Sequence, residues 1–386
     1  MKINTFIPTI YREGLGRVTS PPFDMLSKDQ ERELSENPYN IINLKQCKIP
    51  DEGRQLFGKW LSEGALTKYE KGSFVLMKQT FRIDNSTLSR YGVICLLNMG
   101  EAENCLIPHE RTIPSLVIER SRLIERMEYQ TEPVFVVNDN EELIHTLKEI
   151  METRKCDRHY EEPPGVMNSI CIISDSEEID RIKDSLEGSI GIIADGHHRT
   201  KAMLELSDKY EKKVEFFNNL FAYITSINSE GVLISQVHRV AQYSKDFFSK
   251  IEERFTLEET NDDADPDHAV LHLRAKKFKM IQKNEMSYFE YLKAIDSSIG
   301  KNGGKSGIFY TYEREVALDK VIQNQDDIAV IMPEWKKTQF MQVVKDGKVL
   351  PPKSTYFYPK IPSGIAFYGL DEQECHCGLV GRAADS

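Results

Sequence analysis

The first two thirds of the chain alternate between short apolar runs and segments with apolar residues at helical spacing. Apolar runs at residues 74–77 and 91–97 flank a polar turn at Asp84-Asn85, which predicts a β-hairpin. Residues 115–129 carry apolar side chains three or four positions apart among many charges, which predicts a surface helix. Strands are also expected at 133–137, 169–173 and 190–194 and as a pair at 221–224 and 232–234, with helices at 141–156 and 179–186.

One polar segment interrupts this pattern between two apolar elements. The predicted strand Ile190–Ala194 is followed by Asp195-Gly196-His197-His198-Arg199, and a helix is expected from there to Tyr210. A strand that turns through glycine into a helix directs unpaired backbone N–H groups at whatever lies before the helix, and this arrangement binds phosphate and other anions. The segment is therefore the predicted active site.

Each side chain of this segment suits such a site. Asp195 can accept a proton or hold a metal ion, and His197 and His198 can bind phosphate, transfer a proton or ligate a metal. Arg199 offers a bidentate fork for phosphate. A purely structural role is the alternative: Asp195 would cap the helix, the histidines would be surface residues, and Arg199 would pair with a buried acid such as Asp195.

Three other motifs carry candidate chemistry. In Pro108-His109-Glu110-Arg111-Thr112, Glu110 is a candidate general base or metal ligand and Arg111 a candidate anion clamp. Asp24 follows two prolines and is a second candidate base, unless it only caps the next helix. Lys353, in a Pro-Pro-Lys-Ser-Thr run, could meet a phosphate, unless the run is a proline-bounded edge strand.

Composition narrows the choice of function. The 386 residues carry a net charge of −11, which argues against binding DNA through a broad basic face. No apolar run is long enough to span a bilayer, and the start lacks the apolar stretch of a signal peptide, so a cytoplasmic protein with free thiols is expected from its seven cysteines. Cys375-His376-Cys377 falls short of the four-ligand pattern of a zinc site.

The order of the elements predicts an α/β protein with mixed sheets, too long for one typical core. We expect a domain at residues 1–242 that carries the Asp195–Arg199 segment and an α/β region at 243–386 that completes the cleft. The sequence leaves homo-oligomerisation open.

Six motifs in a fixed order together resemble the family known as domain of unknown function 1015, whose signatures read PPYDV, HE-T, ADGHHRY, HRV and PPKSTYF-PK. The matching residues are Ser20–Met25, Asn37–Tyr39, Pro108–Thr112, Ala194–Arg199, His238–Val240 and Leu350–Phe357. The chain departs from the signatures at Phe23, Met25 and Thr200.

The resemblance implies a nucleotide-binding core similar to the ParB/sulfiredoxin superfamily and an activity like that of the SerK-type free-serine kinases. By this resemblance Gly196, His197, His198 and Arg199 bind nucleotide phosphate together with Arg111 and Lys353, while Asp24, Glu110, Asp195 and His198 act in catalysis. ATP or ADP and Mg²⁺, held by Asp195 and Glu110, are the implied cofactors, and a free amino acid such as L-serine is the implied acceptor. A nucleotide-binding regulatory module without turnover and a metal-dependent hydrolase remain the alternatives.

Overall fold

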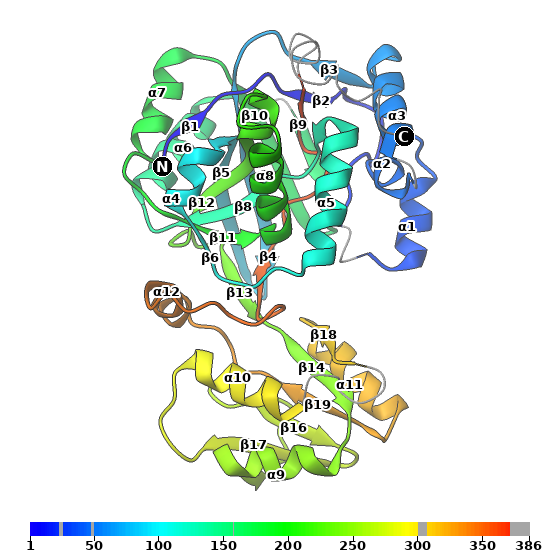
Figure 1. Ribbon diagram of the computed structural model, residues 1–386, viewed down its shortest axis with the longest axis vertical. Coiled ribbons are helices and arrows are strands. Elements are labelled where there is room, and N and C mark those ends of the chain that lie inside the picture. The colour runs from blue at the N-terminus through cyan, green and yellow to red at the C-terminus, as the bar shows by residue number, and fades with distance from the viewer. Residues whose placement is uncertain (23–25, 48–49, 157, 300–306, 371–386) are drawn as a thin grey trace. The chain divides into compact units, whose positions relative to one another are not determined.

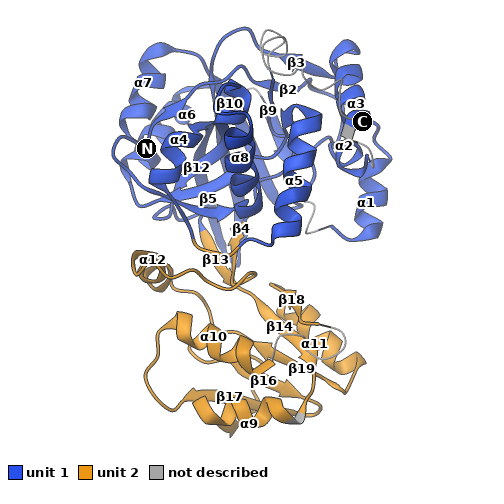
Figure 2. Ribbon diagram, viewed as in Figure 1, with its two compact units in different colours: residues 1–108, 112–232, 359–386 blue, residues 109–111, 233–358 orange. Residues whose placement is uncertain are grey.

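The computed structural model describes residues 1–22, 26–47, 50–156, 158–299 and 307–370. The chain forms two compact units (Figure 2): unit 1 comprises residues 1–108, 112–232 and 359–386, and unit 2 comprises residues 109–111 and 233–358. This division differs from the expected one at residue 242, because the chain leaves unit 1 ten residues earlier and returns to it at Pro359. That the C-terminal region completes a cleft stays a prediction.

Unit 1 is built on a nine-stranded mixed sheet in the order β6-β11-β8-β12-β5-β4-β10-β9, with β1 paired to β5 (Figure 1). The pairs β6–β11 and β8–β12 are parallel and the other pairs are antiparallel. The strands of the sheet are β1 (Ile3–Asn4), β4 (Phe74–Ile83), β5 (Ser86–Asn98), β6 (Leu106–Pro108), β8 (Val134–Asn138), β9 (Arg158–Glu161), β10 (Val166–Ile173), β11 (Gly191–Asp195) and β12 (Asn219–Ser226).

Local sequence explains where several helices of unit 1 begin. Ser27 and Gln30 form a reciprocal capping box at the start of α1, and Pro114 occupies the first turn of α5, where its missing N–H costs nothing. Helices α5 and α8 pack side by side over the sheet (Figure 1). The helices are α1 (Lys28–Ser35), α2 (Ile42–Gln46), α3 (Pro50–Ser62), α4 (Met99–Cys105), α5 (Pro114–Met127), α6 (Glu142–Thr153), α7 (Ser176–Asp184), α8 (His197–Lys209) and the 3₁₀ helix η2 (Glu215–Asn218).

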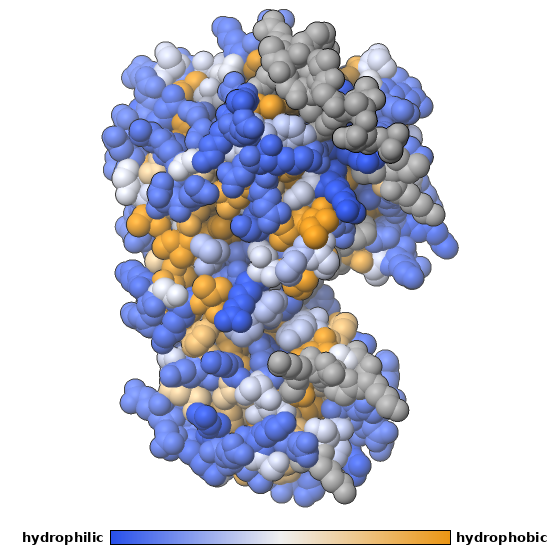
Figure 3. All heavy atoms as spheres, viewed as in Figure 1, coloured by the Kyte–Doolittle hydropathy of each residue, from blue (hydrophilic) through white to orange (hydrophobic). Residues whose placement is uncertain are grey.

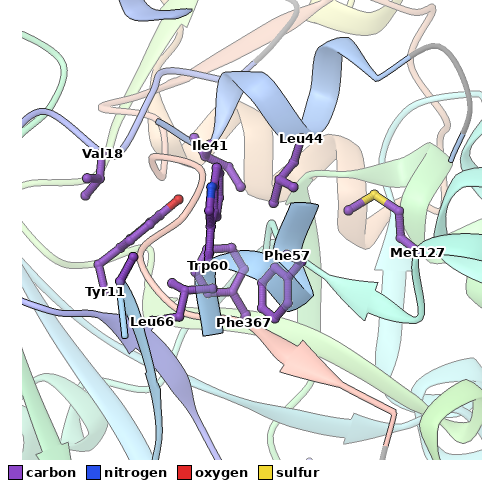
Figure 4. Close-up of a cluster of buried hydrophobic side chains, with 10 residues drawn as sticks. Tyr11, Val18, Ile41, Leu44, Phe57, Trp60, Leu66, Met127 and Phe367 are labelled. Atoms are coloured by element: carbon purple, nitrogen blue, oxygen red, sulfur yellow. The ribbon is translucent and has the colours of Figure 1, made fainter. Parts of the chain in front are cut away.

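A buried aromatic cluster joins the two ends of the described chain in unit 1 (Figure 4). Tyr11, Phe57 and Trp60 pack with Phe367, which lies more than 300 residues after each of them in the sequence. The small sheets β2 (Thr9–Tyr11) with β3 (Leu66–Lys68) and β7 (Tyr129–Gln130) with β21 (Tyr368–Gly369) border this cluster. Burial of these rings holds the segment after Pro359 against unit 1.

Unit 2 has its own six-stranded sheet, in the order β15-β17-β16-β19-β14-β18, and a two-stranded sheet of β13 and β20. Val240, Val270, Ala329 and Ile331 form a buried cluster with residues of α11. The strands are β13 (Leu233–Gln236), β14 (His238–Gln242), β15 (Phe255–Glu259), β16 (Val270–Leu273), β17 (Lys276–Gln282), β18 (Phe309–Thr311), β19 (Asp327–Ile331) and β20 (Thr355–Tyr358); the helices are α9 (Lys245–Arg254), α10 (Tyr288–Ile299), α11 (Arg314–Gln323) and α12 (Lys337–Lys345).

The mixed α/β fold is confirmed, but one expected strand pair is wrong. The predicted strands near residues 221–224 and 232–234 exist as β12 and β13, yet β12 lies between β8 and β5, and β13 pairs with β20. All eight residues of β12 are buried, so this strand occupies the middle of the large sheet and has no open edge for β13.

The expectation of free thiols is also wrong for one pair. Cys156 and Cys171 form a disulfide that ties the segment after α6 to β10, whereas Cys47, Cys95 and Cys105 are free. Residues 375–377 lie outside the described residues. No helix in the described part of the chain is both long and apolar enough to cross a membrane. Figure 3 shows a mainly hydrophilic face with scattered hydrophobic residues.

Candidate functional site at the start of helix α8

The predicted segment lies at the junction of β11 and α8, in unit 1. Gly196 is the N-cap of α8 and has a φ of +93°, a conformation that favours glycine. A Cβ atom at this position would lie 3.1 Å from both Arg199 Nη2 and Val134 Cγ2. Within the described residues no side chain caps the helix. The left-handed conformation of Gly196 therefore allows strand β11 to turn directly into α8.

Asp195 does not cap the helix but binds two cations. Its Oδ1 accepts a hydrogen bond from Lys360 Nζ, and its Oδ2 accepts one from Arg199 Nη2 at 3.0 Å. Lys360 is only 9% exposed in its side chain and comes from the segment that Phe367 anchors in unit 1. The aromatic cluster thus brings a lysine to an aspartate 165 positions away.

The guanidinium of Arg199 is engaged by the protein itself. Besides its bond to Asp195, Nη1 donates to the backbone oxygens of Glu132 and Pro133 at 2.8 Å each. The same Nη1 lies 3.7 Å from the Glu132 carboxylate. These contacts favour the structural alternative for Arg199, in which it fixes the start of α8 relative to the strand β8.

The ion pairs continue through Glu132 to Lys45. Lys45 forms an ion pair with Glu132, and Ser363 Oγ lies 2.6 Å from both the Lys45 Nζ and the Glu132 Oε1. The backbone of Ser363 also forms an isolated antiparallel β-bridge with Ser20, the first residue of the motif Ser20–Met25. The structure therefore places the start of that motif next to the network that holds Asp195. Asp24 lies outside the described residues.

The five charged residues of this network carry an excess of positive charge. Lys45, Arg199 and Lys360 contribute three positive charges and Glu132 and Asp195 two negative ones, a balance of +1. Burial lowers the pKa of Lys45, although Glu132 opposes the change. Burial alone would raise the pKa of Glu132 and of Asp195, but the neighbouring cations, Lys45 and Lys360 foremost, outweigh it and lower both. Both carboxylates are therefore ionised at neutral pH, and Asp195 is a weak proton acceptor.

The two histidines of the segment differ in their surroundings. His197 is buried and interacts electrostatically with Asp195. His198 is half-buried, and its Nε2 accepts a hydrogen bond from the backbone N–H of Ile113 at 3.0 Å. When Nε2 accepts, the neutral ring carries its proton on Nδ1. His198 thus contacts the residue that precedes α5, and its predicted catalytic role stays a prediction.

The His109-Glu110 motif meets the Pro-Pro-Lys-Ser-Thr run inside unit 2. Glu110 accepts hydrogen bonds from the backbone N–H groups of Lys353, Ser354 and Thr355 at 3.1–3.3 Å and from the Thr355 hydroxyl at 3.2 Å. His109 Nε2 lies 2.8 Å from the same hydroxyl oxygen. The Glu110 carboxylate organises a turn in which Lys353 has a φ of +61°. These contacts give Glu110 a structural role in holding the turn at residues 353–355. Its role as a general base stays a prediction.

Arg111 and Lys353 are exposed residues of unit 2, and their predicted contacts with phosphate stay predictions. The Mg²⁺ ligands expected from the sequence fit poorly. Both carboxylate oxygens of Asp195 already accept hydrogen bonds from the side chains of Lys360 and Arg199. Both carboxylate oxygens of Glu110 accept hydrogen bonds from N–H or O–H groups. The described residues contain no group of three or more His, Cys, Asp or Glu side chains placed to hold a metal ion.

Sequence reasoning missed four residues of the network, Lys45, Glu132, Lys360 and Ser363. Lys360 ends the PPKSTYF-PK signature, so the motif itself contained a signal. Glu132 precedes a strand-starting proline, and Lys45 lies on a five-residue helix, and neither position carries a recognisable pattern.

Comparison with known proteins finds distant structural similarities. A mutant free serine kinase in complex with AMP has 13% identity, a TM-score of 0.45, and coverage of 73% of this chain and 93% of that chain. A C-terminally truncated SbnI from Staphylococcus aureus has 12% identity, a TM-score of 0.44 and coverage of 74% and 93%. A conserved hypothetical protein from Pyrococcus furiosus has 14% identity, a TM-score of 0.42 and coverage of 71% and 94%. At these scores nothing about function is transferred.

A search of the curated proteins finds no match. The model of a family described as a protein of unknown function, DUF1015, matches residues 8–301. This range contains five of the six motifs, including the segment at the start of α8. The chain therefore belongs to the DUF1015 family.

Proposed function

We propose that the chain is a nucleotide-dependent small-molecule kinase that holds nucleotide phosphate at the start of α8. The observation that carries the proposal is the excess positive charge of the Lys45, Arg199 and Lys360 network beside the N-terminus of α8 at Gly196. A partly buried positive excess is stabilised by a bound anion, and helix N–H groups add directed donors for phosphate oxygens.

Phosphoryl transfer depends mainly on positioning and on charge stabilisation, which suits a site with little reactive chemistry of its own. In this proposal Arg199 and Lys360 keep Asp195 ionised and rigid, and His197, His198 and the first turn of α8 contact the phosphates. Mg²⁺ arrives as part of the magnesium–nucleotide substrate, and no step is assigned to a protein-bound metal. Asp24 keeps its predicted role as the carboxylate that activates the acceptor hydroxyl.

The acceptor is proposed to be a free amino-acid hydroxyl such as that of L-serine, by the resemblance described above. The test is incubation with ATP or ADP, Mg²⁺ and L-serine, followed by phosphorus NMR. Formation of phosphoserine, lost in Asp24→Asn and retained in the control Asp29→Asn on α1, supports the proposal. Absence of any phosphorylated product from a panel of hydroxyl amino acids contradicts it.

A regulatory module that binds nucleotide without turnover is the second candidate. One observation favours it: Asp195 and Glu110, the described carboxylates predicted to act in catalysis, are both committed to protein contacts. Saturable nucleotide binding without product, together with a nucleotide-dependent change in oligomeric state by light scattering, would favour this reading over the kinase.

A further inference from the structure

Unit 2 contains a hollow of about 470 Å³ that the proposed kinase site does not use. His238, Tyr312 and Glu313 line it together with Arg314, Glu315 and Glu334. His238 belongs to the His-Arg-Val motif, for which the proposed function gives no role. The volume falls within the range of small-molecule sites.

His238 presents a hydrogen-bond donor at this hollow. The residue is 1% exposed, and its Nδ1 accepts a hydrogen bond from the backbone N–H of Met332 at 3.1 Å. Burial, helped by Arg239 and Arg314, lowers the pKa of His238 to about 4, so the ring is neutral at pH 7 and its proton must be on Nε2. Nε2 forms no hydrogen bond with any described residue, and it is not among the fully buried atoms, so it is accessible from the hollow. A donor that faces this hollow can donate to an oxygen of a bound ligand or to solvent.

The rim of the hollow carries uncompensated negative charge. Of its carboxylates, Asp265 pairs with Lys279 at 2.6 Å and Glu315 pairs with Arg314 at 3.1 Å. Glu313 and Glu334 form no ion pair with any described residue. The ring of Tyr312 stacks on Tyr356 with a centroid distance of 4.0 Å, which gives the hollow an aromatic wall. Carboxylates beside an aromatic ring attract an organic cation.

We propose that this hollow binds a small molecule that carries a primary ammonium group next to a neutral oxygen acceptor, the chemistry of amino-acid amides and amino alcohols. The ammonium group binds between Glu313 and Glu334, and the oxygen accepts from His238 Nε2–H. The ligand is a monocation because an added carboxylate would be repelled by the rim. The proposal is independent of nucleotide binding in unit 1.

The test is saturation-transfer NMR on the full chain with L-alaninamide as the probe. Three controls each change one feature: N-acetyl-alaninamide lacks the ammonium group, n-propylamine lacks the oxygen, and L-alanine adds a carboxylate. We expect saturable alaninamide binding in the millimolar range or tighter, and at least tenfold weaker binding of the acetylated probe, since a charge-assisted hydrogen bond is worth that factor or more.

Glu334→Gln removes one rim charge from an exposed position and should weaken alaninamide binding at least fivefold, whereas Glu253→Gln on α9 of the same unit should not. Both variants should keep the wild-type melting temperature. Absence of alaninamide binding, equal binding of the acetylated probe, or equal effects of the two substitutions would overturn the proposal.

Discussion

Replacing Arg199 by lysine keeps its charge but removes its forked geometry. The wild-type guanidinium donates to Asp195 Oδ2 and to the Glu132 and Pro133 backbone oxygens, at 2.8–3.0 Å. A lysine ammonium can reach only part of this set. The loss of one or two charge-assisted hydrogen bonds in a side chain that is 18% exposed should lower the free energy of unfolding by about 2–4 kcal/mol.

The assay is urea unfolding followed by the fluorescence of Trp60, which lies in unit 1. The second tryptophan, Trp335 of unit 2, is replaced by phenylalanine in every protein compared, so that the signal reports unit 1. Arg181→Lys on α7 is the matched control, because Arg181 makes one exposed ion pair with Glu149 and should change stability by less than about 0.5 kcal/mol. Equal stability of the Arg199 and Arg181 variants would refute the structural role of Arg199.

Three further changes test other parts of the structure. Asp195→Asn leaves Lys360 without its anionic partner and should destabilise unit 1 by about 3 kcal/mol in the same urea assay; an effect below about 0.5 kcal/mol would contradict the ion-pair network. Glu110→Gln weakens the bonds to the turn at residues 353–355 and should speed hydrogen exchange of those amides at least tenfold, as mass spectrometry would reveal, whereas unchanged protection would remove the proposed organising role. His238→Asn removes a group whose pKa is about 4 in the folded chain and 6.5 in the unfolded chain. As the pH falls from 6.5 to 4, the unfolded chain takes up this proton first, so the free energy of unfolding of the wild type should fall by up to about 3 kcal/mol relative to that of the variant. Parallel curves of stability against pH for the two proteins would refute this.

Elements defined by local pattern could be predicted from the sequence. The hairpin of β4 and β5 has its turn at the predicted Asp84-Asn85, and α8 begins directly after the predicted Asp-Gly pair. In these cases the signal lies within a few residues, where periodicity and turn chemistry decide the structure.

Partners distant in sequence could not be predicted in this way. Strand β12 does not alternate between polar and apolar residues, so its sequence does not indicate which strands pair with it. Its place between β8 and β5 depends on how the other strands of the sheet pair. On α5, Ile118 satisfies the helical spacing but is 50% exposed, while Val117 is buried, because the facing helices decide which side is covered. Likewise, Lys360 reaches Asp195 only because Phe367 is part of a core formed by the N-terminal segment.

The central claim is that the start of α8 holds nucleotide phosphate. Selective ¹⁵N labelling of histidine gives nine backbone signals, two of them from His197 and His198 in the first turn of α8. On addition of magnesium–ADP or magnesium–ATP, these two amide signals should move further than all others, with His145 on α6 and His159 on β9 unmoved as internal controls. Nine unmoved signals at saturating nucleotide, or shifts confined to histidines other than His197 and His198, would contradict the account.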